Sequence, residues 1–532
     1  MNFVKYVTMR VEDPGGENGM NTEKKENMKN SVWRMVFVGF SVLLQVGWII
    51  TILLMLNEYY GWISMATSLL ALCVVLRIYG RHQNAAMKTS WIILILWFPV
   101  FGLCLYFLCG RSGANWMMRR RFEKSRSKYA HLLKQDSAVL HALEDEDLAV
   151  ANQARYLIQY GPYPVYRNTD ITYYATAEEG IAAQKEALSR AEKFIFMEYH
   201  AIEDSVSFRE IETILVQKAR QGVEVRLFYD DMGSIGFINP SFVRHMERQG
   251  IQCRVFNPLM PVINVFMNNR DHRKITVIDG QVGFTGGYNL ADEYFNVTHP
   301  YGHWKDTGIR LEGDAVRSLT VMFLEMWNAM KPANEDASPY LPPIVYEAQE
   351  TGFVLPYADS PLDDERVGES VYMNIIKNAR QYVYITTPYL ILDDEMALEL
   401  SLAAKRGVDV RIITPGIPDK KLVYKVTRSY YAGLVQSGVR IYEYSPGFLH
   451  AKMMVSDDGV ATVGTINLDY RSLYLHFENG VYLYHCEAVR GVLADFETTF
   501  PLCREVTRQY RSKRSGVLRL GQCLLRLFAP LM

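Results

Sequence analysis

The feature that most constrains this chain is a short motif, HxKxxxxD, that occurs twice. Residues 272–279 read HRKITVID and residues 450–457 read HAKMMVSD. Each copy is followed at the same offset by a glycine, two variable residues and an asparagine: GGYN at 286–289 and GTIN at 464–467. A lone HxK is weak evidence because histidines near lysines are common. Two full copies with matching downstream residues indicate a duplicated structural unit.

The duplication extends well beyond the motif. Residues 218–226 and residues 404–411 each contain the end of a helix at a glycine and the start of a β-branched strand. Residues 250–258 match residues 438–446 position by position in residue type. Alternating helices and strands favour an α/β fold. We predict two pseudo-symmetric lobes with mixed sheets flanked by helices, at 165–335 and 344–510, joined by a polar, proline-rich linker.

The motif residues suit the chemistry of a phosphodiester. Side chains two apart in a strand share a face, so each histidine points the same way as the lysine after it. Lysine, asparagine amide and turn N–H groups can neutralise phosphate oxygens as charge builds in the transition state. We therefore predict catalytic residues at His272, Lys274, Asp279, His450, Lys452 and Asp457, and phosphate-binding residues at Asn289, Asn467, Gly287 and Thr465.

The two histidines can divide the work of one reaction. A neutral imidazole attacks phosphorus and forms a covalent intermediate, while a protonated imidazole donates to the leaving alcohol. The residues alone leave open which histidine attacks. The motif acids Asp279 and Asp457 have an alternative role, which is to cap the turn after the strand.

Aligning the two halves also predicts a pair of supporting carboxylates. Residues 304–312 align with 476–484, and this places Asp306 and Glu478 at matching positions ahead of a strand. Such acids can orient an imidazole and stabilise its cation. Solvated acids at the start of a strand are the alternative.

The N-terminal region is apolar in three stretches: 35–56, 61–76 and 91–109. The first is long enough to cross a bilayer, and buried core helices of a soluble protein are the alternative. We predict a membrane-embedded region at 32–110 with two spanning helices. The third stretch contains WFPVFG at 97–102, and we interpret it as a re-entrant or interfacial hairpin.

Basic residues set the expected orientation of this region. The break at 57–60 has no lysine or arginine, whereas 77–88 and 111–126 are rich in both. The positive-inside rule places these basic segments in the cytoplasm. We therefore expect a multi-pass cell-membrane protein with a cytoplasmic tail at 1–31 and lobes on the cytoplasmic face.

Three further segments are interpreted as lipid-facing. Residues 111–164 are predicted to be a basic juxtamembrane linker. Residues 511–532 alternate leucines and arginines at helical spacing, which predicts an amphipathic tail on anionic lipid or a helix docked on the protein. An apolar insertion at 259–271, absent from the second half, contacts acyl chains or forms an extra buried loop.

The charge and the cysteine content restrict the partners, disulfides and metal sites that we expect. The formal net charge of −1 argues against a chain whose main partner is nucleic acid. The seven cysteines occur singly, with no CxxC pair and no cluster with histidine, so we predict neither a disulfide framework nor a metal site.

The paired motifs resemble those of the phospholipase D superfamily, over roughly residues 165–510. The segment KTSW at 88–91 and the run HWKDT at 303–307 resemble the bacterial cardiolipin synthases within it. The resemblance implies phosphatidyl transfer between two phosphatidylglycerol molecules, with release of glycerol and no metal or organic cofactor. It also implies His272 as the nucleophile and His450 as the acid and base. Where the family pattern has serine before the asparagine, this chain has Gly287 and Thr465.

Other functions remain open from the sequence alone. A hydrolytic phospholipase D, or a transferase with another alcohol acceptor, differs only in what reaches the covalent intermediate. A membrane-anchored nuclease and an inactive lipid-binding scaffold are the alternatives of another class. The expected partners are phosphatidylglycerol and anionic membrane lipid, and the oligomeric state is not predicted.

Overall fold

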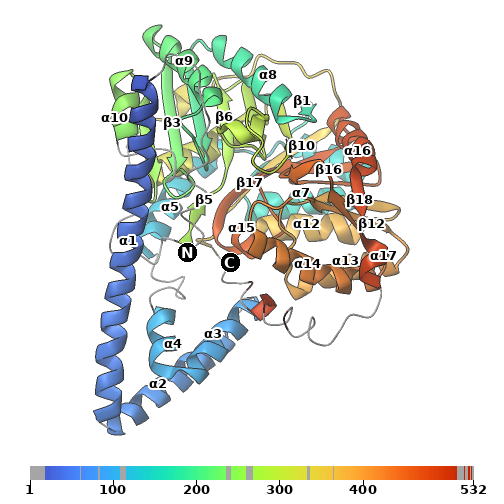
Figure 1. Cartoon of the computed structure of the whole chain (residues 1–532). Coiled ribbons are helices and arrows are strands. Elements are labelled where there is room, and N and C mark those ends of the chain that lie inside the picture. Colours follow the sequence, from blue (N-terminus) through green and yellow to red (C-terminus); the bar gives the residue numbers. More distant parts are fainter. Residues whose placement is uncertain are drawn as a thin grey trace.

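The structure is a computed structural model of the 532-residue chain. It describes residues 18–59, 61–81, 84–107, 116–234, 241–258, 268–331, 336–363 and 365–511, with 521, 525–527 and 529 of the C-terminal segment. Two α/β lobes lie together, and a group of apolar helices extends from them at one end (Figure 1). The apolar insertion at 259–267 lies outside the described residues.

The first lobe is built on a seven-stranded mixed sheet of order β1-β9-β7-β6-β2-β3-β4. Strands β2, β3 and β4 are parallel, and the other neighbours pair antiparallel. In that order the strands are Thr169–Tyr174, Gly308–Gly313, Val282–Gly286, Lys274–Ile278, Phe194–Tyr199, Glu224–Asp230 and Gln252–Phe256.

The second lobe repeats this topology strand for strand. Its sheet has the order β10-β17-β16-β15-β11-β12-β13, with β18 added at the edge. These strands are Phe353–Asp359, His476–Tyr484, Val460–Gly464, Met453–Ser456, Tyr382–Thr386, Asp409–Pro415, Arg440–Tyr444 and Cys503–Glu505. The predicted α/β fold with two pseudo-symmetric lobes is confirmed.

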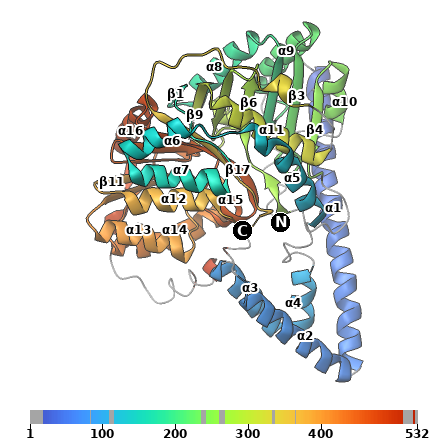
Figure 2. The same ribbon diagram turned by 180° about the vertical axis from the view of Figure 1, so that it is seen from behind.

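Matching helices flank the two sheets. The first lobe has α8, α9, α10 and α11, and the second has α12, α13, α14 and α16 (Figures 1 and 2). Their bounds are Ala177–Ser189, Val206–Arg220, Ser241–Arg248 and Val316–Met330, then Val367–Asn378, Asp394–Lys405, Lys421–Gln436 and Glu487–Thr499. Helix α11 contacts β10 and α16 contacts β1, so each lobe sends one helix onto the other's sheet. One apolar core therefore runs through both lobes.

Two short strand pairs join the lobes beside the motifs. Strand β5 (Arg270–Asp271) of the first lobe pairs in parallel with β17, and β14 (Gly447–Leu449) of the second pairs in parallel with β8 (His303–Lys305). Each pair directly precedes one motif histidine. The duplication thus places both motifs at the same junction.

The described residues of the N-terminal region form the helices α1 (Asn18–Tyr59), α2 (Gly61–Tyr79), α3 (Ala85–Trp97) and α4 (Pro99–Leu105). Helices α1 and α2 contain stretches long and apolar enough to cross a membrane, at Gly39–Leu56 and Gly61–Tyr79. Helix α1 includes residues 18–31 of the predicted tail, so this part of the tail is continuous with the first apolar helix. In both views the first half of α1 lies at the level of the first lobe (Figures 1 and 2).

The third apolar stretch bends at Phe98. Pro99 begins α4, as expected for a residue that cannot continue the preceding helix. A Cβ at Gly102 would overlap the backbone of Ile95, so this glycine lets α4 pack closely against α3. The break lies inside the segment where the sequence predicted a hairpin.

The interpretation of 111–164 as a basic linker is wrong for the residues that the structure describes. They form α5 (Trp116–Tyr129), α6 (Ser137–Glu146) and α7 (Leu148–Tyr160), which pack on the lobes (Figure 2). Apolar side chains such as Leu143 of α6 and Leu157 of α7 are fully buried in the common core. Arg126 Nη1 lies 3.0 Å from Asp363 Oδ2, so part of the basic charge is paired within the protein.

The C-terminal segment follows α17 (Thr507–Arg511), and its described residues dock on the protein. Arg526 donates to the Ser429 carbonyl of α14 and stacks 4.3 Å from the centre of the Tyr430 ring. Ser90 of α3 donates to the Leu527 carbonyl at 2.8 Å. For these residues the docked alternative holds, and the segment connects the membrane region to the second lobe.

Candidate active site

The two motif histidines lie where the lobes exchange strands. His272 follows β5, and its backbone N–H donates to the Phe477 carbonyl of the second lobe at 2.9 Å. His450 follows β14, and its N–H donates to the Lys305 carbonyl of the first lobe at 2.7 Å. Each histidine is therefore held by a strand of the opposite lobe.

Both imidazoles are oriented by a carboxylate, and the pairing crosses between lobes. His272 Nδ1 lies 2.9 Å from Glu478 Oε2, and His450 Nδ1 lies 2.6 Å from Asp306 Oδ2. Both acids are buried. With Nδ1–H donated to a carboxylate, Nε2 keeps its lone pair. The predicted supporting acids thus contact the histidines, each from the lobe that does not carry its partner.

The motif lysines lie beside these pairs. Lys274 Nζ donates to the His272 carbonyl at 2.6 Å, and Lys452 Nζ donates to the His450 carbonyl. Burial lowers the pKa of Lys274 to about 8 and that of Lys452 to about 7, while Asp306 and Glu478 oppose the shift. Both lysines respond to both acids, which shows that the two motifs share one electrostatic environment.

The imidazoles are largely neutral in this environment. Burial, followed by the charges of Lys274 and Lys452, lowers the pKa of His272 well below its usual value. Burial and Lys452 lower the pKa of His450 to about 4, against the opposing charge of Asp306. Asp306 itself has a lowered pKa because His450 and Lys452 outweigh its burial, so it stays ionised.

The predicted phosphate-binding turns differ from expectation. The Gly287 and Thr465 N–H groups donate to the Thr307 and Asn479 carbonyls, so neither is free to bind a phosphate oxygen. Their backbone role was predicted wrongly because these turns stay paired with the next strand of the sheet. The Thr465 hydroxyl instead donates to Glu478, which fixes the acid behind His272.

Gly287 makes room for the other acid. A Cβ at this position would overlap Asp306 Oδ1. The departure from the family's serine is therefore explained by packing: the shorter Asp306 sits where a side chain at 287 would lie. The supporting acid of the first half, Asp306, is packed against Gly287, whereas that of the second half, Glu478, accepts a hydrogen bond from Thr465.

Substituting this glycine tests the packing argument. We expect Gly287→Ala to displace Asp306 from His450 and to lower turnover by about 100-fold, the scale of losing general acid–base catalysis. Turnover by purified variants is the measurement, with Thr465→Ser as the control because it keeps the hydroxyl on Glu478. Near wild-type turnover of the alanine variant would contradict the account.

The two asparagines are also unequal. Asn289 accepts from the Ala201 N–H at 3.2 Å and donates to the Tyr294 hydroxyl at 2.8 Å, so part of its amide is structural. Asn467 is buried, and its Oδ1 has no hydrogen-bond partner among the described residues. Both follow the strand next to their motif, and phosphate binding by either remains a prediction.

Asp279 and Asp457 lie at the wrong end of their strands for catalysis. Seven residues of extended chain, or about 20 Å, separate each from its histidine. Asp279 accepts the backbone N–H groups of residues 192–194, and Asp457 accepts those of residues 380–382. Their placement corrects the catalytic assignment and matches the alternative of a turn cap.

Asp279→Ala should therefore act on stability. It removes the acceptor of three N–H groups, which we expect to lower the free energy of unfolding by about 2–4 kcal/mol. Thermal unfolding and turnover of the folded fraction are the two measurements, with the exposed neighbour Glu192→Ala as the control. Loss of turnover without loss of stability would restore a catalytic role.

The sequence missed what surrounds each histidine. The rings of His200 and His476 lie 4.9 and 5.5 Å from that of His272, whereas Trp304 and Tyr294 lie 5.3 Å from His450. Trp304 and His476 hold equivalent positions in the internal alignment, so comparing the halves for differences as well as matches would have found them.

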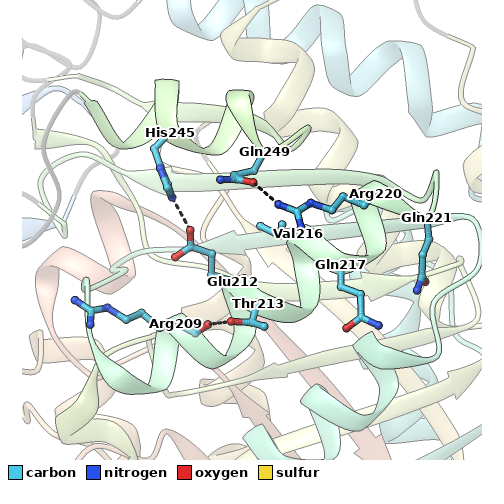
Figure 3. A pocket seen from close by; sticks show the side chains of 9 residues that line it. All are labelled: Arg209, Glu212, Thr213, Val216, Gln217, Arg220, Gln221, His245 and Gln249. Atoms are coloured by element: carbon cyan, nitrogen blue, oxygen red, sulfur yellow. Dashed lines mark hydrogen bonds and ion pairs between the residues drawn. The ribbon is translucent and has the colours of Figure 1, made fainter.

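One groove among the described residues lies away from this junction. It measures about 730 Å³ between α9 and α10 and is lined by charged and polar side chains, including the pair His245 and Glu212 (Figure 3). None of the predicted site residues lines it. We assign the chemistry to the buried junction, where the acids and imidazoles converge.

Comparison with known proteins agrees with this architecture. The family described as "Cardiolipin synthase, PLD-like domain" matches residues 185–327 and 372–500, and the family "Phospholipase_D-nuclease N-terminal" matches 66–111. A crystal structure of phosphatidylserine synthase from Haemophilus influenzae superposes with a TM-score of 0.51 at 14% identity. It covers 71% of this chain and 97% of that one, and it shows the shared fold.

Relatives of similar length give the family. An uncharacterised protein of Streptococcus mutans is 43% identical over 86% of this chain and 99% of its own. A cardiolipin synthase of Geobacillus kaustophilus is 32% identical over 90% and 95%, and cardiolipin synthase 2 of Bacillus cereus is 34% identical over 86% and 89%. With both motifs at one junction and this similarity along most of its length, the chain belongs to the cardiolipin synthase family of phospholipase D-like phosphatidyltransferases.

Proposed function

We propose that this membrane enzyme makes cardiolipin by moving a phosphatidyl group from one phosphatidylglycerol to a second, with release of glycerol. The observation that carries the proposal is the crossed arrangement of His272 with Glu478 and His450 with Asp306. It brings two imidazoles into one buried junction, where His450 also affects the pKa of His272, and a two-step displacement at phosphorus needs two such groups. Complete motifs on both sides argue against an inactive scaffold.

In the first step His272 Nε2 attacks phosphorus and the bond to the glycerol oxygen breaks. His450, carrying a proton on Nε2, gives it to that oxygen, so glycerol leaves as a neutral alcohol. The phosphatidyl group is then bonded to Nε2 of a cationic His272 ring, and Glu478 stabilises that charge through Nδ1–H. Lys274 and Lys452 stabilise the phosphate oxygens.

In the second step the hydroxyl of another phosphatidylglycerol enters. Neutral His450 takes its proton, the oxygen attacks phosphorus, and the bond to His272 Nε2 breaks. Cardiolipin leaves, His272 is neutral again, and His450 has regained its proton. Water in place of the lipid hydroxyl would give phosphatidic acid, the hydrolytic outcome.

Charge balance explains how His450 is protonated although its pKa is low in the free enzyme. The junction holds two lysines and two histidines, and burial lowers the pKa of all four, which suppresses part of their positive charge. A phosphodiester brings one negative charge and favours the protonated forms. Substrate binding is therefore coupled to proton uptake.

This coupling predicts a pH dependence of apparent affinity. In the free enzyme Lys452 has a pKa of about 7, and the bound phosphodiester raises it, so the proton is already present below about pH 7. Above that pH the affinity falls by up to about tenfold for each pH unit. Above about pH 8, loss of the proton of Lys274 lowers the affinity further. KM for phosphatidylglycerol in mixed micelles should rise with pH. A constant KM between about pH 6 and 9 would refute the coupling.

We also propose that α1 and α2 span the membrane with the lobes on its cytoplasmic side. Support comes from the basic segments at 77–88 and 111–126, and from the first half of α1 lying level with the lobes (Figures 1 and 2). Cysteine labelling of residues 57–60 and 116–126 from each side is the test. Labelling of both regions from one face would contradict this topology.

Lipid products decide the function. Purified full-length protein is incubated with phosphatidylglycerol vesicles, and lipids and free glycerol are quantified. We expect cardiolipin and glycerol in equal amounts. Phosphatidic acid as the main product would establish hydrolysis instead, and cleavage of DNA without lipid turnover would establish a nuclease.

A further inference from the structure

A second kind of chemistry is built into the His272 half of the site. Glu478 Oε1 lies 2.9 Å from His272 Nδ1 and 3.6 Å from His476 Nδ1. The ligand atoms of these three side chains all lie within 4.8 Å of one another. The hydrogen bond of His272 Nδ1 goes to Oε2, and among the described residues neither Glu478 Oε1 nor His476 Nδ1 makes a hydrogen bond of good geometry, although Glu478 is fully buried and His476 is nearly so.

These separations suit a tetrahedral metal ion. With zinc–nitrogen and zinc–oxygen bonds of about 2.0–2.1 Å, neighbouring ligands of a tetrahedral site lie about 3.3 Å apart. The two distances at Glu478 Oε1 bracket this value. Two imidazoles and one carboxylate with an open fourth position form a common ligand set for zinc.

A third imidazole lies next to this set. The ring of His200 is 4.9 Å from that of His272, and its Nδ1 donates to the Asp271 carbonyl at 2.7 Å. That bond leaves Nε2 of His200 with its lone pair. Histidine ligands of metals are typically held by such a backbone carbonyl on the other nitrogen.

The duplication provides an internal comparison. Trp304 occupies in the His450 half the position that His476 occupies in the His272 half, because β8 and β17 pair with β14 and β5 in the same register. Asp306 therefore has one imidazole beside it, whereas Glu478 has two. As far as the structure describes it, the His450 half has no counterpart of this ligand set, so the set takes one ion per chain.

Nearby cations limit the affinity. Lys274 and Lys452 lie close enough to shift the pKa of His272, and Arg471 Nε donates to His476 Nε2 at 3.3 Å. Binding through His476 Nδ1 places the proton of a neutral ring on Nε2, so Arg471 must turn away, which its partial exposure permits. We expect micromolar rather than nanomolar affinity.

We propose that His272, His476 and Glu478 form an inhibitory site for one divalent transition-metal ion of the zinc type. Inhibition rests on the proposed role of His272 as nucleophile. A metal on Nδ1 displaces the proton from the bond with Glu478, and the neutral ring then carries it on Nε2. The lone pair that attacks phosphorus is lost, so metal binding and catalysis exclude each other.

Binding is measured without reference to activity. Metal-free full-length protein in detergent is titrated with Zn²⁺ by calorimetry and with Co²⁺ by visible absorption, where tetrahedral cobalt gives intense bands. We expect one ion per chain for the wild type, a loss of affinity of at least about tenfold for His476→Asn, and no change for the distant His245→Asn. Equal zinc affinity of His476→Asn and wild type would overturn the site.

Inhibition is measured separately on phosphatidylglycerol vesicles. Zn²⁺ should inhibit the wild type reversibly, with recovery on adding EDTA, and should inhibit His476→Asn only at a concentration at least about tenfold higher. Zinc binding without inhibition would overturn the inhibitory role. If His272 is not catalytic, His272→Ala stays active, and this result is independent of the calorimetry, so the two proposals fail separately.

Discussion

His272→Ala should abolish the release of an aryl alcohol from a phosphatidyl ester, whereas His450→Ala should leave that release nearly intact. The reason lies in the leaving group. An aryl alcohol such as p-nitrophenol leaves without a proton, so the general acid is dispensable, but phosphorus must still be attacked. We expect His272→Ala to lower the turnover of the aryl ester and of phosphatidylglycerol by at least about 10⁴-fold, in line with the removal of other nucleophiles.

With phosphatidylglycerol both variants should be inactive. Glycerol is a poor leaving group, and His450→Ala should lose about 10²–10⁴-fold on it, against less than about tenfold on the aryl ester. The measurement is initial release of p-nitrophenol beside formation of cardiolipin. The reverse pattern, with His450→Ala inactive on the aryl ester and His272→Ala active, would assign the attack to His450.

The second large effect follows from the crossed acids. Glu478→Gln should slow turnover of phosphatidylglycerol by about 10²–10⁴-fold, because the orienting carboxylate sets the tautomer of its imidazole. Glu478 belongs to the second lobe, yet its partner is His272 of the first lobe. Release from the aryl ester should therefore fall as well.

Asp306→Asn provides the matched comparison. Asp306 belongs to the first lobe but contacts His450, so this variant should lose cardiolipin synthesis while sparing the aryl ester. Adding Glu478→Gln to His272→Ala should have no further effect, because residues that act as a unit are not additive. If Glu478→Gln instead spared the aryl ester, as His450→Ala does, and Asp306→Asn did not, the crossed arrangement would be contradicted.

Much of the fold was predictable because the sequence contains two similar halves. The matched segments at 218–226 and 404–411 predict the same helix–strand unit, and both sheets have the same strand order. The positions of Asp306 and Glu478 followed from the same alignment. Their crossing did not, because an alignment of two halves carries no information on which half contacts which.

Other features depended on tertiary contacts. Residues 116–160 read as basic and polar, yet Tyr129 and Leu143 are buried in the apolar core that runs through both lobes. The role of Gly287 could be recognised only when Asp306 was seen beside it. The sequence predicted no metal site because His272 and Glu478 are 206 residues apart and meet only through β5 and β17.

The central claim is a single composite site in which His272 carries the phosphatidyl group. It is tested most directly by mixing the full-length enzyme with phosphatidylglycerol labelled in its phosphate, quenching within one turnover at alkaline pH, and mapping the labelled peptide. We predict an acid-labile label on the peptide containing His272, absent from His272→Ala and accumulating when the enzyme is in excess over the lipid. A label on the His450 peptide, or turnover with no labelled protein, would contradict the account.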